Sequence, residues 1–199
     1  MDLQSIKRLI ARHNLQPGHR RVLPALLLAA LALAVLAGSA LAAGGNLVKN
    51  GSFEKDGNGD GIPNKWGDLG TTGLDKRVCN TSAVGKCSFR MVGESVNKFL
   101  VQELAISGDA SDDFDLSAWT RGKDLDLTGN AQVIVFFNHT GGGVNQWSIG
   151  IPDGTSAWTF RLFIGASSTA DFDSISVAIY NSKVSGKMWV DKVKLVPSP

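Results

Sequence analysis

The chain has few of the residues on which most enzyme active sites and nucleic-acid interfaces depend. Its 199 residues include three histidines, two cysteines and one tyrosine. Beyond residue 43 there are 15 basic and 17 acidic residues, a net charge of −2, so no overall positive field attracts polyanions. The sequence also lacks a phosphate-binding glycine loop and a cysteine-rich zinc motif. We therefore expect no nucleic-acid partner.

Candidate catalytic groups are equally scarce. His139 is the only histidine beyond residue 43, and no Ser-His-Asp or metal-ligand spacing surrounds it. A glycosidase needs a pair of carboxylates, and the spacing of Glu54, Glu94 and Glu103 does not single out a pair. A small polysaccharide-degrading enzyme, a hydrolase or lyase, remains an alternative, with His139 and Tyr180 as its proton-transfer pair.

The first 43 residues have a different composition from the rest. The first 21 positions hold five basic residues and one acidic residue, and residues 22–43 carry no charge. A basic start, an apolar run and the small residues Ala40 and Ala42 are typical of a secretory signal peptide. We expect residues 1–42 to form a hydrophobic export helix that is cleaved after Ala42. The alternative is an uncleaved membrane anchor, because the run is long enough to span a bilayer.

Export has consequences for location and for the cysteines. We expect the protein to be secreted or held in the cell envelope, with membrane contact only through an uncleaved first segment. Cys79 and Cys87 lie eight positions apart, and in an exported chain such a pair more often forms a disulfide than a metal site. The bond would close one hairpin-sized loop.

Residues 43–199 are predicted to form one all-β domain. The domain holds 21 of the 23 glycines, roughly double the usual ~7 % share, and short apolar runs alternate with turn residues. The runs predict nine strands, at residues 46–53, 88–92, 99–106, 113–121, 131–138, 146–151, 158–164, 174–180 and 187–196. This pattern predicts a two-sheet β-sandwich of the jelly-roll type.

Alternation along two of these strands places aromatic rings among polar side chains. Trp119 lies opposite the apolar side of residues 113–121, and Tyr180 lies opposite the apolar side of residues 174–180. Sugar rings stack their C–H faces on aromatic rings, and their hydroxyls need polar partners, so such a face suits sugar recognition. The alternative is that loops cover both rings and add them to the core.

Two further strands also carry aromatic residues. In residues 158–164, Phe160, Leu162 and Ile164 share one side, which we expect to face the core, and this leaves Phe163 on the other face with Thr159 and Arg161. Trp147 alternates with Ile149, which is more typical of the core. We retain Trp147 as a further candidate for a sugar contact.

A glycine-rich loop carries a candidate calcium motif. Asp56, Asn58 and Asp60 occupy alternate positions before Gly61, as in calcium loops, but residue 67 is a glycine where an EF-hand carries a bidentate glutamate. An EF-hand is therefore not expected. The loop is either a calcium-holding surface loop or a turn built on Asx side chains that binds no metal.

Five segments of the domain follow a recognisable order. They are Asn46-Leu-Val-Lys-Asn-Gly-Ser-Phe-Glu54, a Gly- and Asp-rich loop ending in Trp66, Cys87-Ser-Phe-Arg-Met91, Phe114-Asp-Leu-Ser-Ala-Trp119 and Lys187-Met-Trp-Val-Asp-Lys-Val-Lys-Leu195. In this order they resemble the carbohydrate-binding modules of the family four, nine and twenty-two group. The resemblance spans nearly the whole domain, and its most specific parts are the opening and closing segments.

The resemblance implies a fold, an ion and a binding face. These modules are jelly rolls that bind polysaccharide without cutting it and carry a structural calcium, for which Glu54 and Asp191 occupy the matching positions. Two carboxylates brought together there repel each other unless a cation lies between them. The family often has a second aspartate next to the last one, whereas this chain has Lys192. Sugar contacts in the family come from the concave sheet face.

We therefore expect a calcium-stabilised module that binds a polysaccharide or glycan reversibly. Trp119 and Tyr180 are expected to stack on sugars, and Asn138 and Arg121 to supply hydrogen bonds. Besides the enzyme, one other alternative remains, a structural or adhesion protein of the cell envelope that uses this fold for protein contacts. A large exposed apolar patch would favour that alternative.

Overall fold

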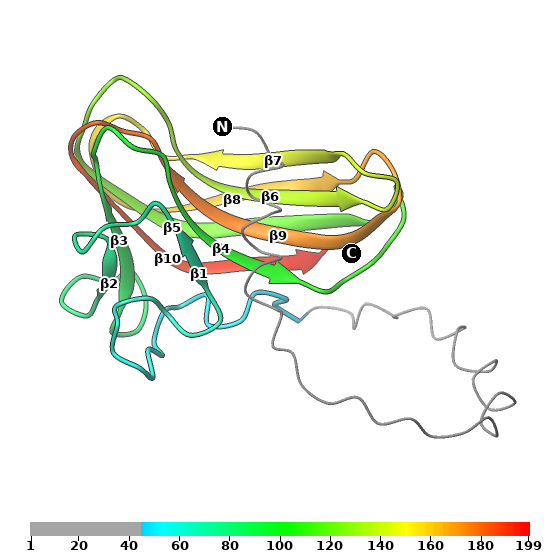
Figure 1. Cartoon of the computed structure of the whole chain (residues 1–199), viewed down its shortest axis with the longest axis horizontal. Coiled ribbons are helices and arrows are strands. Elements are labelled where there is room, and N and C mark those ends of the chain that lie inside the picture. The colour runs from blue at the N-terminus through cyan, green and yellow to red at the C-terminus, as the bar shows by residue number, and fades with distance from the viewer. Residues whose placement is uncertain (1–44) are drawn as a thin grey trace, which may run out of the picture. The chain divides into compact units, whose positions relative to one another are not determined.

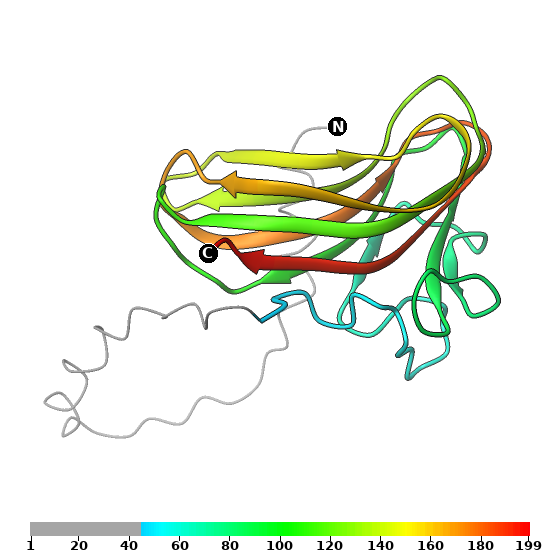
Figure 2. The same ribbon diagram turned by 180° about the vertical axis from the view of Figure 1, so that it is seen from behind.

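The computed structural model describes residues 45–199, and the predicted export segment, residues 1–42, lies outside the described residues. The described residues form two five-stranded antiparallel sheets that pack as a sandwich (Figures 1 and 2). Sheet A has the order β1-β4-β9-β6-β7, and sheet B has the order β2-β3-β10-β5-β8. The all-β, two-sheet prediction is confirmed. No helix among residues 45–199 is long and apolar enough to span a membrane.

The strands follow the predicted positions closely. Their bounds are β1 (Gly67–Leu69), β2 (Lys76–Val78), β3 (Ser88–Val92), β4 (Lys98–Leu104), β5 (Asp113–Leu125), β6 (Ala131–His139), β7 (Val144–Gly150), β8 (Gly154–Ser167), β9 (Phe172–Asn181) and β10 (Lys187–Pro197). Eight of the nine predicted strands are present within a few residues. Strands β1 and β2 were not predicted, because three residues are too few for an alternating pattern.

The strand predicted at residues 46–53 is wrong. Asn50 and Phe53 have positive φ angles, of 50° and 57°, which interrupt an extended chain. The segment instead follows β10 through isolated hydrogen bonds, among them Leu47 N–H to the Leu195 carbonyl and Val193 N–H to the Gly51 carbonyl. At Gly51 a Cβ atom would lie 2.2 Å from the Val193 carbonyl oxygen, so only glycine fits this close approach.

The core lies between the two sheets and is rich in phenylalanine. Phe114 of β5, Phe137 of β6 and Phe172 of β9 are fully buried, and their ring centroids lie 5.3 to 6.2 Å apart. Rings at these distances and tilted angles favour one another beyond the area they bury. This cluster packs the inner face of sheet A against the inner face of sheet B. The outer faces of the two sheets therefore lie on opposite sides of the sandwich.

The predicted orientation of β8 is wrong. Phe163 pairs with the core residue Leu116 and packs against the core, whereas Phe160, Leu162 and Ile164 are 51, 49 and 69 % exposed. Irregular pairing between β5 and β8, with several register shifts, sets this orientation. The inward-facing Arg161 is accommodated because its Nε–H donates to the Thr120 hydroxyl at 2.9 Å. An apolar strip therefore lies on the outer face of sheet B.

A buried cluster of charged side chains lies at the start of β4. Lys98 is fully buried, and its Nζ lies 2.8 Å from a carboxylate oxygen of the equally buried Asp75. Glu94, four residues earlier, forms a second ion pair with the same Nζ. Lys98 also donates to the Val92 carbonyl, so the charged group is fully partnered.

Candidate functional site

Tyr180 lies on the outer face of sheet A beside a second aromatic ring. It pairs with Phe99 of β4 and with Gln132 of β6, and the ring centroids of Phe99 and Tyr180 are 4.7 Å apart with an angle of 31° between the planes. The Tyr180 hydroxyl hydrogen-bonds the Asn97 side chain at 3.1 Å. Both rings are partly exposed, so together they form a fixed aromatic platform at one end of β9.

Small side chains follow along the same face of β9. Ser174, Ser176 and Ala178 lie on the same side of β9 as Tyr180, and of these three Ser174 is partly exposed whereas Ser176 and Ala178 are buried. Bulkier side chains flank them on β4 and β6, among them Val101 and Phe136. A ligand lying along β9 would therefore contact the side chains of β4 and β6 rather than Ser176 and Ala178.

Asn138 lies on this face as well, at the other end of the strip. Its Nδ2 donates to the hydroxyls of Ser174 and Ser176, at 3.0 and 3.2 Å, and its carbonyl oxygen accepts no hydrogen bond from a described residue. The side-chain amides of Gln132 and Gln146 lie on the same face and also have no hydrogen-bond partner within residues 45–199. These groups are free to bond the hydroxyls of a ligand.

Trp119 and Arg121 lie on the opposite face of the sandwich. Trp119 pairs with Phe160 of β8, with ring centroids 5.7 Å apart, and the guanidinium of Arg121 lies 5.2 Å from the ring centre of Trp189 in β10. The structure therefore does not bring Trp119 and Arg121 together with Tyr180 and Asn138. It separates the predicted sugar contacts into two groups, one on each sheet.

Trp147 belongs to neither group. It pairs with the core residue Val135, and on the edge strand β7 its ring packs against Phe163 of β8 at 5.2 Å between centroids. Its indole N–H donates to the Ser167 carbonyl at 2.8 Å, and 37 % of the side chain is exposed. Trp147 thus closes the edge of the sandwich between β7 and β8.

The proton-transfer pair of the enzymatic alternative is not formed. Tyr180 pairs with Gln132 near the start of β6, whereas His139 is the last residue of that strand. Seven residues of extended chain separate them by about 23 Å. The His139 ring instead bonds the Asn145 side chain at 2.8 Å, across the turn between β6 and β7.

Asp191 and Glu54, the predicted calcium ligands, meet on the outer side of sheet B. Asp191 is fully buried, its Oδ2 accepts the backbone N–H groups of Ala83 and Val84 at 2.9 Å, and its Oδ1 has no partner among the described residues. Burial raises the pKa of Asp191, and the nearby negative charge of Glu54 raises it further. A buried carboxylate oxygen without a donor is where a cation would be accommodated.

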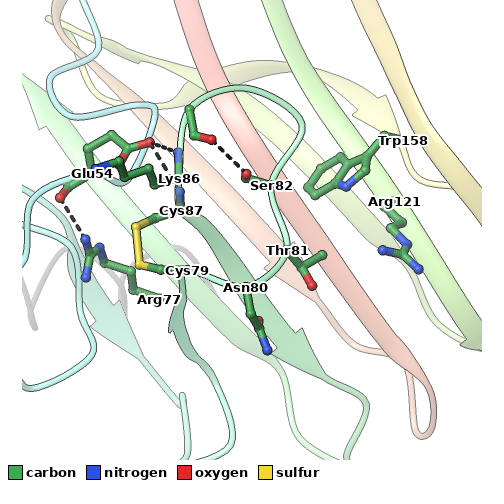
Figure 3. A pocket seen from close by; sticks show the side chains of 11 residues that line it. Glu54, Arg77, Cys79, Asn80, Thr81, Ser82, Lys86, Cys87, Arg121 and Trp158 are labelled. Atoms are coloured by element: carbon green, nitrogen blue, oxygen red, sulfur yellow. Dashed lines mark hydrogen bonds between the residues drawn. A yellow bond between two sulfur atoms is a disulfide. The ribbon is translucent and has the colours of Figure 1, made fainter.

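The loop at residues 79–87 brings these carboxylates together. The predicted disulfide between Cys79 and Cys87 closes it, and its backbone N–H groups at Lys86 and Cys87 donate to Glu54 Oε1 at 2.7 and 3.2 Å (Figure 3). At Gly85 a Cβ atom would lie 2.3 Å from the same oxygen. The two carboxylates fit a hard cation such as calcium. No group of three or more acidic, histidine or cysteine side chains within residues 45–199 could hold a metal, so carbonyls or water must supply further ligands.

The loop at residues 56–64 has the geometry of a turn built on its own side chains. Asp56 accepts the N–H groups of Gly59 and Gly61, at 3.0 and 3.1 Å, and Asp60 accepts the Ile62 N–H and the Asn58 amide at 2.7 and 2.6 Å. All four carboxylate oxygens are therefore engaged within the loop. This arrangement matches the Asx-turn alternative.

Some residues of both faces were not singled out from the sequence. Phe99 and Gln132 lie beside Tyr180, and Trp158 lies beside Arg121 on sheet B, because Thr120 pairs with Thr159. Only the pairing of strands distant in sequence shows these neighbours. The alternation that puts Phe99 on the opposite side of its strand from the apolar Leu100 was the one available signal.

Comparison with known proteins supports the fold. No protein-family model and no curated protein sequence matches the chain. A family 16 carbohydrate-binding module is 19 % identical with a TM-score of 0.59, and the match covers 76 % of this chain and 99 % of the module. The module TmCBM61, solved in complex with β-1,4-galactotriose, is 18 % identical with a TM-score of 0.52, over 77 % of this chain and 99 % of the module.

The same fold also occurs in an enzyme. A Stig cyclase from Fischerella sp. TAU is 12 % identical with a TM-score of 0.54, over 77 % of this chain and 97 % of the cyclase. At these identities the likeness is one of fold. The chain therefore shares the β-sandwich of carbohydrate-binding modules, as its sequence motifs predict, and function must be argued from its own side chains.

Proposed function

We propose that the domain beyond residue 42 binds a polysaccharide or glycan on the outer face of sheet A and does not cut it. The observation that carries this proposal is the Phe99–Tyr180 platform, which lies on the same face as polar groups that have no partner among residues 45–199. An aromatic platform attracts the C–H face of a sugar ring. The carbonyl of Asn138 and the amide of Gln132 supply the fixed polar contacts that hydroxyls require.

The length of the face favours a chain of sugars over a single sugar. From Tyr180 to Ser174 the strand β9 extends six residues, or about 20 Å. Ser176 and Ala178 are buried, so along the centre of this face an extended chain would rest on the partly exposed side chains of β4 and β6, such as Val101 and Phe136. The proposed ligand is therefore a polysaccharide chain with its first ring stacked at Tyr180 and its far end near Asn138.

We also propose that calcium between Glu54 and Asp191 stabilises the domain. A bound cation would neutralise the two carboxylates and hold the disulfide-closed loop against sheet B. Because these residues lie on sheet B, the ion would not contact a sugar on sheet A. The oxygens of Asp56 and Asp60 already accept hydrogen bonds within their loop, so we place the ion at Glu54 and Asp191.

We further propose where the protein acts and which type of sandwich it forms. Residues 1–42 direct export, either as a cleaved signal peptide or as an anchor, and the sandwich is a jelly roll that acts outside the cytoplasm. Sugar binding at an envelope or in the medium suits a domain whose candidate site carries free amides and aromatic rings and no paired catalytic groups among the described residues.

The test is a pull-down of the full chain, in mild detergent, on a panel of insoluble and immobilised neutral polysaccharides. Each positive is assayed for new reducing ends and, for a lyase, for unsaturated products. Binding without products supports the proposal. Products from any bound polysaccharide would favour the enzymatic alternative, and a folded protein that binds none would favour an envelope protein that contacts other proteins.

A further inference from the structure

Positive and aromatic side chains form a row across the outer face of sheet B. Lys76 pairs with Arg90, Arg90 with Trp189, and Trp189 with Arg121, so the four side chains share one face of β2, β3, β10 and β5. Trp158 continues the row on β8, because the preceding pair is Thr120 with Thr159. The row runs from basic residues at one edge to a tryptophan at the other.

Of the two arginines in this row, Arg121 is the one whose guanidinium has no hydrogen-bond partner among residues 45–199. Its guanidinium lies over the Trp189 ring at 5.2 Å and makes no hydrogen bond or ion pair with any residue from 45 to 199. By contrast, Arg77 donates to the carbonyls of Phe53 and Glu54, and Arg90 donates to the carbonyl of Leu74. Stacking on Trp189 orients the planar fork of Arg121 and leaves its donors available.

Arg121 and Trp158 line one side of an open cavity of about 940 Å³ (Figure 3). The disulfide-closed loop lines the other side with the small polar residues Asn80, Thr81 and Ser82. The cavity thus offers an aromatic wall, a guanidinium and several hydroxyl or amide groups. This is the combination that a polar ligand with one flat apolar face requires.

The charged side chains that line the cavity are Arg77, Lys86 and Arg121 against Glu54, so their net charge is positive. Of the acidic side chains nearby, Asp191 is buried beneath the loop, and Glu54 accepts backbone N–H groups. Lys86 lines the cavity, and Lys123 and Lys187 pair with each other in the next row of the sheet. Although the domain as a whole is slightly acidic, this face would attract an anion.

We propose that this cavity binds a carboxylate-bearing sugar unit of an acidic glycan. Arg121 binds the carboxylate through two parallel hydrogen bonds, the geometry for which its fork is suited. The Trp158 ring stacks on the sugar, and the polar loop bonds its hydroxyls. The site lies on the opposite sheet from Tyr180, so it is independent of the proposed neutral-glycan site on sheet A and would give the domain a second ligand class.

The test uses calorimetric titration of the full chain with tetrasaccharides of galacturonate, guluronate, mannuronate and glucuronate units. Each is compared with the same tetrasaccharide after carboxyl reduction, which replaces every carboxylate with a neutral hydroxymethyl group. We expect at least one uronate to bind about tenfold or more tightly than its reduced counterpart, and added salt to weaken that binding.

Variants locate the site. Arg121→Gln and Trp158→Ala should each weaken uronate binding about tenfold or more, and Arg121→Lys should weaken it less than Arg121→Gln because it keeps the charge without the fork. Lys123→Gln removes the same charge from the same strand outside the cavity and should change affinity less than about threefold. Tyr180→Ala should leave uronate binding unchanged.

Three results would overturn the proposal. They are no binding of any uronate by the folded protein, equal binding of the reduced counterparts, and equal losses in Arg121→Gln and Lys123→Gln. A control with phosphatidylglycerol vesicles tests whether the basic face binds an anionic membrane surface instead of a glycan. Binding to vesicles without binding to uronates would assign this face to a membrane surface.

Discussion

The ring of Tyr180 lies 4.7 Å, centroid to centroid, from the ring of Phe99 on the neighbouring strand of sheet A. Tyr180 is the only tyrosine of the chain. Because Phe99 supports one side of its ring and Asn97 holds its hydroxyl, the platform is fixed before a ligand arrives. A site ordered in advance loses little conformational entropy on binding.

We expect Tyr180→Ala to weaken binding of a neutral polysaccharide about tenfold or more, equivalent to at least about 1.4 kcal/mol. Tyr180→Phe keeps the ring and should lose less than about threefold. The matched control is Trp119→Ala, which removes an aromatic ring from the opposite sheet. Affinity electrophoresis in gels containing the polysaccharide measures all three. An equal loss in Trp119→Ala would place the neutral glycan elsewhere.

Asp191→Asn tests the proposed ion. An amide at this position can still accept the Ala83 and Val84 N–H groups and no longer repels Glu54. In chelator at neutral pH, we therefore expect the variant to be at least as stable as the unmodified protein. Calcium should stabilise only the unmodified protein, by about 2.7 kcal/mol at 100 times its Kd. Thermal melts that shift equally for both proteins would contradict a site at Asp191.

The raised pKa of Asp191 predicts that, in chelator, the stability of the fold depends on pH. The pKa of Asp191 in the folded state is raised above its ordinary value of 3.8, so folding favours the protonated form. Its contribution to stability is therefore present below pH 3.8 and is lost as the pH rises through the folded-state pKa. Urea titrations across the acid range should show the protein losing stability relative to Asp191→Asn as pH rises. A constant difference between the two would contradict the raised pKa.

Lys98→Met should destabilise the fold by about 3 to 5 kcal/mol, because it leaves the buried Asp75 without its cation. Replacing both charges, with Lys98→Met and Asp75→Asn together, should recover part of this loss. Urea unfolding measures both variants. A loss below about 1 kcal/mol in the single variant would show that the pair is not buried in solution.

Removing the disulfide, with Cys79→Ser and Cys87→Ser together, should cost about 2.5 kcal/mol for a loop of this length. It should also weaken the calcium-dependent stabilisation, because the freed loop carries the amides that hold Glu54 and Asp191. Thermal melts with and without calcium separate the two effects. An unchanged calcium increment would show that the loop does not organise the ion site.

Local sequence patterns predicted the strands and the disulfide. Which strands share a sheet, and which polar residues are buried, depends on the pairing of segments distant in sequence. The alternation in β5 and β9 correctly placed Phe114 inside and Tyr180 outside. It could not show that these strands belong to different sheets, which separates Trp119 from Tyr180. Likewise, no local signal marks Lys98 as buried, because its partners come from a loop more than twenty residues earlier and from Glu94.

The most direct test of the central claim is to map a bound neutral polysaccharide by NMR chemical-shift changes in the labelled full chain. The account predicts changes that follow sheet A, at Phe99, Gln132, Asn138 and Tyr180, with sheet B unchanged. Changes gathered at Trp119 and Phe160, or no saturable changes with any neutral glycan, would contradict it.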